Sequence, residues 1–410
     1  MKFSEVLGQQ AMKDQLVHMV DQNRLSHALL FLGREGSGAL PLALAFAQYI
    51  LCTGRLGLSA GSLSSPSLFG EPDIFPAAIE ADGDSCGFCP SCSKVSALVH
   101  PDLHYTYPVV TKKSTEPPVS ADYAAEWRDF IKQYPYGNAY DWLQMIGAEN
   151  KQGNITAREC AEINRNLNLK SFESEYKIIL IWMPEYLDRE GNKLLKIIEE
   201  PPEKTLFILV AQDENGILPT ILSRTQLIKI PSLTDEEIEE ALIERAGIEE
   251  NKARKIAGVS EGNYREAIKS LQHADEDWQV LLRDWLNAIL RNGPVSVVKW
   301  LDEIGKLGRE KQKQFLRYFI HQLEQSIRLS VEESAGVGAE KNDFQIASED
   351  RDFGSRFNKL CGMEAKAAII RELDKASYYI ERNAHGKMLF HALSIRLSYI
   401  IKDKSLILVN

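Results

Sequence analysis

Hydrophobic positions in the first 230 residues gather in short runs that are separated by segments with helical periodicity. The apolar runs are typical of strands buried on both faces of a parallel sheet, and they cover residues 26–32, 176–181, 205–211 and 227–230. Amphipathic or alanine-rich helices are predicted at 10–22, 40–51, 156–169 and 188–200. Strands that alternate with helices in this way predict an α/β domain built on a parallel sheet.

The pattern becomes helical after Pro231. Thr234 followed by three acidic residues is a helix start, because threonine caps a helix and early acid suits its N-terminus. Long amphipathic helices are predicted between 276 and 407, with an interruption near Gly336-Val337-Gly338. The chain is therefore expected to divide into three parts, at 1–231, 232–275 and 276–410.

Two segments interrupt the α/β pattern. Residues 53–85 are rich in Gly, Ser and Pro and are predicted to form a loop. Residues 111–152 are polar, with scattered Tyr, Trp and Pro, and are predicted to be an insertion whose structure the pattern leaves open.

The first apolar run leads into a glycine turn, Gly33-Arg34-Glu35-Gly36-Ser37-Gly38, and then into the alanine-rich helix. Strand, glycine loop and helix in this order are the context of a P-loop, G-x-x-x-x-G-K-[ST]. Gly33 and Gly38 have the required spacing, but Ala39 and Leu40 stand where the phosphate-binding Lys and the magnesium-binding hydroxyl belong. The loop is predicted to keep the shape of a nucleotide site without its charge or metal ligand, although the glycines alone would equally fit a tight turn without function.

The next predicted strand also lacks a residue that an active ATPase needs. A magnesium-binding carboxylate would follow Ile181 in an active ATPase, yet the sequence continues Trp182-Met183-Pro184-Glu185. Glu185 could bind the metal only after a shift of register. ATP hydrolysis is therefore not expected, weak nucleotide binding stays open, and Trp182 and Met183 are expected to fill the pocket with apolar bulk.

Composition restricts the functional classes. Of the 410 residues 44% are hydrophobic and 26% are charged, which are ordinary globular values. No uncharged stretch of membrane-spanning length and no apolar signal region are visible, so the expected location is cytoplasmic. A net charge of −10 disfavours a protein that grips nucleic acid across a broad surface of its own, since phosphate neutralisation needs clustered Lys and Arg.

Three of the six cysteines form a CxxCxxC run, Cys86-Gly87-Phe88-Cys89-Pro90-Ser91-Cys92. In a cytoplasmic chain such a run indicates a metal site before it indicates disulfides, and the spacing lets one turn present several thiolates to a zinc ion. Tetrahedral zinc needs a fourth ligand. Cys52 is the leading candidate, and His100 and His104 compete with it.

These landmarks together resemble the delta-prime family of subunits of the bacterial DNA polymerase III clamp loader. The segments that carry the resemblance are Phe3 with Val6-Leu7-Gly8-Gln9, Ser26 to Phe31, the four cysteines followed by His100-Pro101-Asp102, Leu194 to Pro202, and Leu218 to Thr225. The last two are similar to the family signatures LLKxLEEPP and LLPTIxSRC, with Thr225 in place of Cys. The resemblance covers about residues 1–230 apart from the two interruptions. After residue 230 it extends only to the architecture.

The resemblance implies an AAA+ P-loop module at 1–231 with a zinc module at about 52–105, a helical lid at 232–275, and an all-helical collar at 276–410 that assembles a five-subunit ring. The implied zinc ligands are Cys52, Cys86, Cys89 and Cys92. The implied partners are the motor subunits of gamma/tau type and the delta subunit, with the sliding clamp and primed DNA reached through the complex.

Two arginines acquire roles from the resemblance. Arg224 matches the Arg of the Ser-Arg-Cys motif, which reaches the ATP of the neighbouring subunit and stabilises charge on the γ-phosphate. Such an arginine finger needs only position and charge, so it can persist in a subunit that has lost its own ATPase site. Arg265 stands where the family's lid carries a sensor arginine, and a solvated helix charge would explain it equally well.

The predicted function is that of a non-hydrolysing delta-prime-type loader subunit, which is a part of the polymerase holoenzyme and no enzyme by itself. An active motor subunit of the same loader is one alternative, which Ala39 and Trp182 disfavour. A zinc-containing nucleic-acid-binding protein outside the loader is another, which the net charge disfavours. A redox protein using the CxxC pairs would leave the Glu-Glu-Pro-Pro and Ser-Arg segments unexplained.

Overall fold

The chain forms two compact units, which are described separately below. One comprises Met1–Ala257 with Glu261–Ile268, and the other comprises Gly258–Ser260 with Lys269–Asn410. The computed structural model describes residues 1–55, 83–111, 117–148, 151–272, 278–335, 348–381 and 384–402. Most of the predicted loop at 53–85 and the predicted interruption near 336–338 lie outside these ranges, and the three-part division at 231 and 275 stays a prediction.

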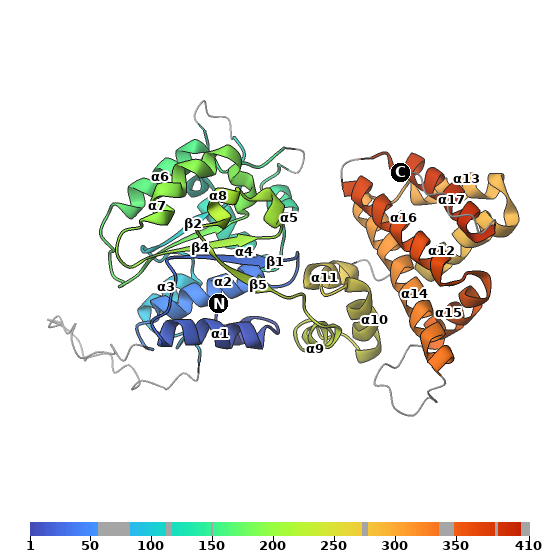
Figure 1. The fold of residues 1–410 in the computed structure, drawn as a ribbon, viewed down its shortest axis with the longest axis horizontal. Coiled ribbons are helices and arrows are strands. Elements are labelled where there is room, and N and C mark those ends of the chain that lie inside the picture. The colour runs from blue at the N-terminus through green and yellow to red at the C-terminus, as the bar shows by residue number, and fades with distance from the viewer. Residues whose placement is uncertain are drawn as a thin grey trace. The chain divides into compact units, whose positions relative to one another are not determined.

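The first unit is built on a five-stranded sheet in which all neighbouring strands are parallel, in the order β2-β3-β4-β1-β5 (Figure 1). The strands are β1 (Ala28–Gly33), β2 (Leu103–Thr106), β3 (Lys177–Trp182), β4 (Thr205–Ala211) and β5 (Gln226–Ile230). Every residue of β3 and β4 is buried, which explains their continuous apolar sequences. The α/β prediction is confirmed, but the edge strand β2 was not predicted.

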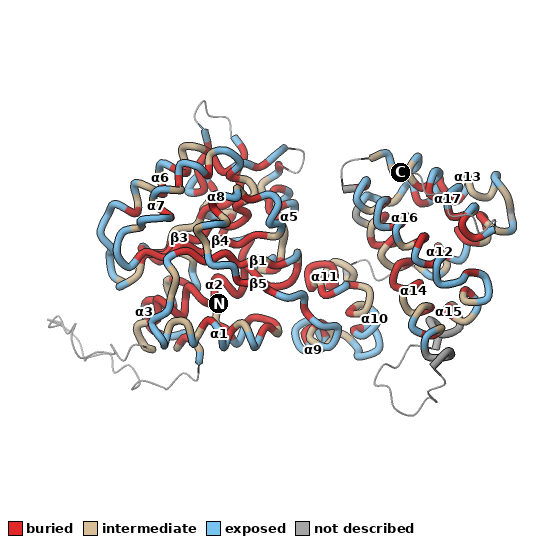
Figure 2. Tube along the Cα trace, in the orientation of Figure 1, coloured by how far each residue is buried: buried red, intermediate tan, exposed pale blue. Residues whose placement is uncertain are grey.

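Helices cover both faces of this sheet, with α1 to α3 on one face and α6 to α8 on the other (Figure 1). Successive residues of β1 alternate between two apolar clusters, since Leu29 and Phe31 join one and Ala28 and Leu30 join the other. The helices are α1 (Gln10–Asp21), α2 (Ala39–Leu51), α3 (Pro90–Ser96), α6 (Ala157–Leu167), α7 (Leu195–Glu199) and α8 (Pro219–Leu222). All residues of α2 are buried, so its alanine-rich composition suits close packing on every side (Figure 2).

The helix expected at 188–200 is wrong in detail. A 3₁₀ segment, η3 (Pro184–Leu194), occupies most of this region, and only the short α7 is α-helical. Asp188 has a φ of 42°, which interrupts regular helix geometry inside η3. The predicted stop before the two prolines at 201 and 202 is confirmed.

The insertion has a defined structure where it is described, at 117–148. It contains η2 (Ser120–Tyr123), α4 (Ala124–Gln133) and α5 (Ala139–Met145), and a short 3₁₀ turn, η1 (Phe3–Glu5), lies near the N-terminus. Trp127, Phe130 and Trp142 are almost fully buried, with ring centroids 5.4–5.6 Å apart. Trp127 stacks on Phe130, and both rings meet Trp142 edge to face. The spacing of Trp127, Phe130 and Ile131 is helical, and this signal would have predicted α4.

Three helices follow β5: α9 (Asp235–Ala246), α10 (Glu250–Ser260) and α11 (Tyr264–Gln272), and a 3₁₀ turn, η4 (Glu214–Gly216), precedes α8. The predicted start at Thr234 is confirmed by a capping box. The Glu237 amide donates to Thr234 Oγ1 at 3.2 Å, and the Thr234 amide donates to the Glu237 carboxylate at 2.9 Å. Gly247, in the left-handed conformation, ends α9.

The regular elements that the structure describes in the second unit are all helices, as predicted. Its elements are α12 (Trp278–Asn287), the π-helical η5 (Ala288–Asn292), α13 (Pro294–Ile304), α14 (Arg309–Ala335), α15 (Ser348–Leu360), α16 (Met363–Glu381) and α17 (Gly386–Lys402). Trp285 stacks on Trp300 with centroids 4.7 Å apart at the centre of its core, and Phe315 and Phe390 surround the pair. Within the described residues, no helix is both long and apolar enough to cross a membrane.

Candidate functional site

The glycine turn that the sequence predicts as a P-loop lies between β1 and α2. Gly36 and Gly38 have φ angles of 72° and 89°, which side chains other than that of glycine rarely adopt. Ala39 opens α2 directly behind the turn. The turn therefore lies at the carboxyl end of β1 and leads directly into α2, whereas the residues at the start of α2 supply neither an ammonium group nor a hydroxyl.

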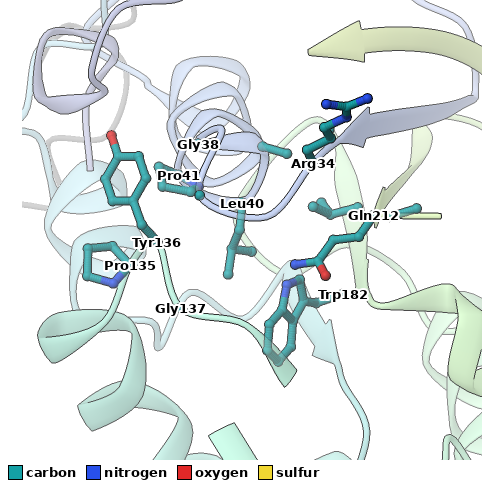
Figure 3. Close-up of a pocket in the computed structure, with 14 residues that line it drawn as sticks. Arg34, Gly38, Leu40, Pro41, Pro135, Tyr136, Gly137, Trp182 and Gln212 are labelled. Carbon is teal, nitrogen blue, oxygen red and sulfur yellow. The ribbon is translucent and has the colours of Figure 1, made fainter. Parts of the chain in front are cut away.

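The space in front of this loop is a cavity of about 20 Å³ (Figure 3). It is lined by residues of the turn and of the start of α2, by Pro135–Gly137 of the insertion, by Trp182, and by Val210–Gln212 at the end of β4. Such a volume holds about one water molecule, whereas pockets for ligands of nucleotide size enclose about 300 Å³ or more. The space in this cavity is thus much smaller than a pocket of nucleotide size.

Trp182 is the largest side chain at this cavity, and the insertion holds it there. Its ring lies 5.2 Å from Trp127 and 5.5 Å from Phe130, centroid to centroid, and the residue is 2% exposed. Leu40, in the position of the missing hydroxyl, is 4% exposed and lines the same cavity. Met183 is buried too, but it does not line the cavity, so only one of the two residues expected to fill the pocket does so.

Glu185 does not replace the missing magnesium ligand. Its Oε1 accepts hydrogen bonds from the backbone amides of Gln212 at 2.6 Å and Asp213 at 2.9 Å, and the residue does not line the P-loop cavity. Burial raises the pKa of this carboxyl group. The side chain therefore ties η3 to the end of β4.

Tyr136 of the insertion covers the P-loop from another side (Figure 3). Its ring would lie 3.1 Å from a Cβ atom placed on Gly38, and its hydroxyl accepts a hydrogen bond of 2.8 Å from the Leu7 amide. Burial raises its pKa to about 12, so the phenol stays neutral. Sequence reasoning missed Tyr136, because nothing in the insertion indicated contact with the glycine turn.

Arg265 is not a solvated helix charge. Its side chain is 5% exposed and forms ion pairs with Glu35 of the glycine turn, Asp141 of the insertion and the adjacent Glu266. Burial alone would lower the pKa of Arg265, but the neighbouring carboxylates, Asp141 and Glu35 foremost, raise it on balance. The guanidinium thus binds carboxylates of this chain.

The four cysteines of the predicted metal site come together. Their Sγ atoms all lie within 4.8 Å of one another, and those of Cys86 and Cys92 are 3.9 Å apart. Thiolates around a tetrahedral zinc ion, with Zn–S bonds of about 2.3 Å, lie about 3.8 Å apart. The fourth member of the cluster is Cys52, at the end of α2.

The two competing histidines lie outside the cysteine cluster. The ring nitrogens of His100 lie near other groups, since Nδ1 accepts from the Asp102 amide at 3.2 Å and Nε2 lies 3.2 Å from both Glu173 and Ser174. Burial lowers the pKa of both His100 and His104. Of the alternatives left open by the sequence, the structure supports Cys52.

Arg224 lies in the turn between α8 and β5, with its side chain 32% exposed. Its Nε donates to a carboxylate oxygen of Glu199 at 3.0 Å, and Nη1 donates to the Thr220 carbonyl at 3.0 Å and to Ser223 Oγ at 3.2 Å. These contacts orient a guanidinium that remains accessible from outside the unit.

Comparisons with known proteins agree on one family. The family model for "DNA polymerase III, delta subunit" matches residues 8–61 and 75–234. The DNA polymerase III subunit delta' of Bacillus subtilis is 24% identical over 262 residues, which are 64% of this chain and 58% of that protein. The delta' subunit of Haemophilus influenzae is 23% identical over 70% of this chain and 68% of that protein.

A gamma subunit is similar over a shorter stretch. The DNA polymerase III subunit gamma of Buchnera aphidicola (strain APS) is 27% identical over 46% of this chain and 59% of that protein. The matches to the Bacillus subtilis delta' subunit and to this gamma subunit each span about three fifths of the relative's own length.

Proposed function

Because the chain belongs to the DNA polymerase III delta subunit family and is a clamp-loader subunit of delta-prime type, we propose that it serves in the loader without hydrolysing ATP. In this proposal it helps to assemble the hetero-oligomeric ring that places the sliding clamp on primed DNA. Its partners are motor subunits of gamma/tau type and the delta subunit, in the cytoplasm.

The observation that carries the non-hydrolysing role is the filled P-loop cavity. Hydrolysis needs a cation at the β and γ phosphates, a magnesium ion and room for the nucleotide. Ala39 and Leu40 provide neither lysine nor hydroxyl, and Trp182 occupies the place of the carboxylate. The remaining volume of about 20 Å³ would not admit a triphosphate.

Arg224 is the residue through which the chain would act on a neighbour's ATP. An arginine finger stabilises charge that spreads over the γ-phosphate oxygens, and the planar guanidinium offers several donors in fixed directions. Arg224 is partly exposed, and an exposed ion pair such as that with Glu199 contributes only about 0.2–1 kcal/mol, so a phosphate in trans could replace Glu199.

The cysteine cluster would hold a structural zinc ion. Four thiolates form a closed tetrahedral set of the kind found in structural sites, which leaves no open position for catalysis. The cluster joins the end of α2, through Cys52, to the turn at 86–92 and the start of α3. The zinc would thus fix this turn against the helix that follows the P-loop.

Reconstitution tests the proposal. The chain is mixed with the motor and delta subunits of the same organism, and the ATPase activity stimulated by clamp and primed DNA is measured beside the chain alone. We expect one complex, a stimulated ATPase that the mixture without this chain lacks, and no ATPase from the chain by itself. ATP hydrolysis by the isolated chain would favour a motor subunit, and failure to join the complex would contradict the loader role.

A further inference from the structure

The backbone of the P-loop is in contact with side chains that the chain itself supplies. A Cβ atom placed on Gly36 would lie 1.9 Å from Oδ1 of Asn263, and one placed on Gly38 would lie 3.1 Å from the ring of Tyr136. Asn263 belongs to residues 261–268, which lie at the start of α11 and are called the lid segment below. The turn is thus covered by the insertion and by the lid segment at once.

One buried guanidinium joins the three pieces of chain. Arg265 Nη1 donates to Glu35 of the glycine turn at 2.6 Å and to Glu266 of the lid segment at 2.6 Å. Its Nε and Nη2 bind the two carboxylate oxygens of Asp141 in the insertion, and the Nη2 contact is 2.8 Å long. Arginine binds carboxylates and phosphates through the same fork of donors, so these carboxylates occupy donors that a phosphate group would otherwise take.

Neutral contacts reinforce this cluster. Asn138 Nδ2 donates to Glu35 at 2.9 Å, and the Asn138 side chain also caps α5 by accepting from the Asp141 amide. The Tyr264 amide donates to the Gly36 carbonyl at 3.3 Å. The ring of Tyr264 meets that of Tyr136 edge to face, with centroids 5.0 Å apart.

The arrangement favours one closed position of the lid segment on the P-loop. Opening it would expose Asp141 and Arg265, which are 8% and 5% exposed, or leave one of them buried without its partner. A buried charge that has lost its ion-pair partner is strongly unfavourable. Closure needs no ligand, because each element supplies its own partners.

We propose that side chains of the insertion take the place of a bound nucleotide in closing the lid segment on the P-loop. Asp141 and Tyr136, with Glu35 of the turn, hold the lid segment there through Arg265. This inference builds on the proposed absence of nucleotide. It does not depend on Arg224 or on assembly of the loader.

Hydrogen exchange of the isolated full-length chain tests this proposal, since local opening sets the exchange rate of protected amides. We compare the lid segment in wild type, Asp141→Asn and the control Asp129→Asn, which changes an exposed carboxylate in α4 of the same insertion. Asp141→Asn is expected to speed exchange in the lid segment by about tenfold or more, while Asp129→Asn leaves it unchanged. Magnesium-ATP is expected to leave wild-type exchange unchanged.

Glu35→Gln provides a second variant, because the Glu35 side chain is 30% exposed and its amide analogue keeps the shape of the turn. It is expected to speed exchange in the same segment. Slower exchange of the wild-type lid segment with magnesium-ATP would overturn the proposal. The proposal would also be overturned if the lid segment exchanged at the same rate in Asp141→Asn and Glu35→Gln as in Asp129→Asn. Because the loader is absent from this experiment, its result is independent of the reconstitution described above.

Discussion

Arg224 and Glu199 form an ion pair with 3.0 Å between Nε and the carboxylate oxygen Oε2. Glu199 ends α7 in the segment that resembles the Glu-Glu-Pro-Pro signature, and Arg224 follows α8 in the segment that resembles the Ser-Arg-Cys signature. The pair therefore connects two signatures that lie apart in sequence, and it orients the guanidinium at the surface of the first unit.

Glu199→Gln should weaken the orientation of the Arg224 guanidinium without removing the guanidinium itself. Since exposed ion pairs contribute about 0.2–1 kcal/mol, the stimulated ATPase of the reconstituted loader should change by about fivefold at most. The measurement is the steady-state ATPase with clamp and primed DNA, with Glu200→Gln, at the adjacent exposed position, as the control. A complete loss of activity in Glu199→Gln would give Glu199 a larger part in catalysis than this account assigns.

Trp182→Ala should destabilise the first unit without producing a working ATP site. Truncating a buried tryptophan to alanine costs about 3–5 kcal/mol in the free energy of unfolding, because apolar burial is lost and a cavity remains. The lysine, the hydroxyl and the magnesium carboxylate would still be absent. Denaturant unfolding and an ATPase assay of the isolated variant check both parts, and Trp182→Phe, which retains a ring, should lose less stability.

Zinc should be bound at about one ion per chain, and Cys52 should be required for it. Metal analysis of the purified protein should show this content in wild type and its loss in Cys52→Ser. Cys160→Ser is the matched control, because Cys160 is also buried but lies outside the cluster. Retention of zinc in Cys52→Ser together with its loss in His104→Gln would identify His104 as the fourth zinc ligand instead.

His104 should make stability depend on pH. Burial and the nearby Lys177 ammonium lower its pKa below 6.5 in the folded chain. The unfolded chain then binds a proton at this ring before the folded chain does, so the free energy of unfolding falls as pH drops from about 6.5 toward the folded pKa. Unfolding of wild type and His104→Gln across this range should show a smaller decline for the variant, and parallel curves would contradict the assignment.

How far the sequence predicts the structure depends on where the partners of each residue lie. The strands β3 and β4 were predicted because each contains a continuous apolar run, whereas β2, with the sequence Leu-His-Tyr-Thr, has no such run. The cysteine site was predicted from the close spacing of Cys86, Cys89 and Cys92, with Cys52 as the leading candidate for the fourth ligand. Burial of Arg265 could not be predicted, because Asp141 and Glu35 precede it by 124 and 230 residues.

The action of Arg224 on a neighbouring subunit is tested by comparing Arg224→Ala with wild type in the reconstituted loader. Arg165→Ala, which removes an exposed arginine from α6, is the control. We predict that all three proteins enter the complex equally, and that only Arg224→Ala loses most of the ATPase stimulated by clamp and primed DNA, by about 10³-fold if the finger contributes as in other phosphoryl-transfer enzymes. Equal stimulated rates in Arg224→Ala and wild type would contradict the claim, and the chain would then be a scaffold of the ring.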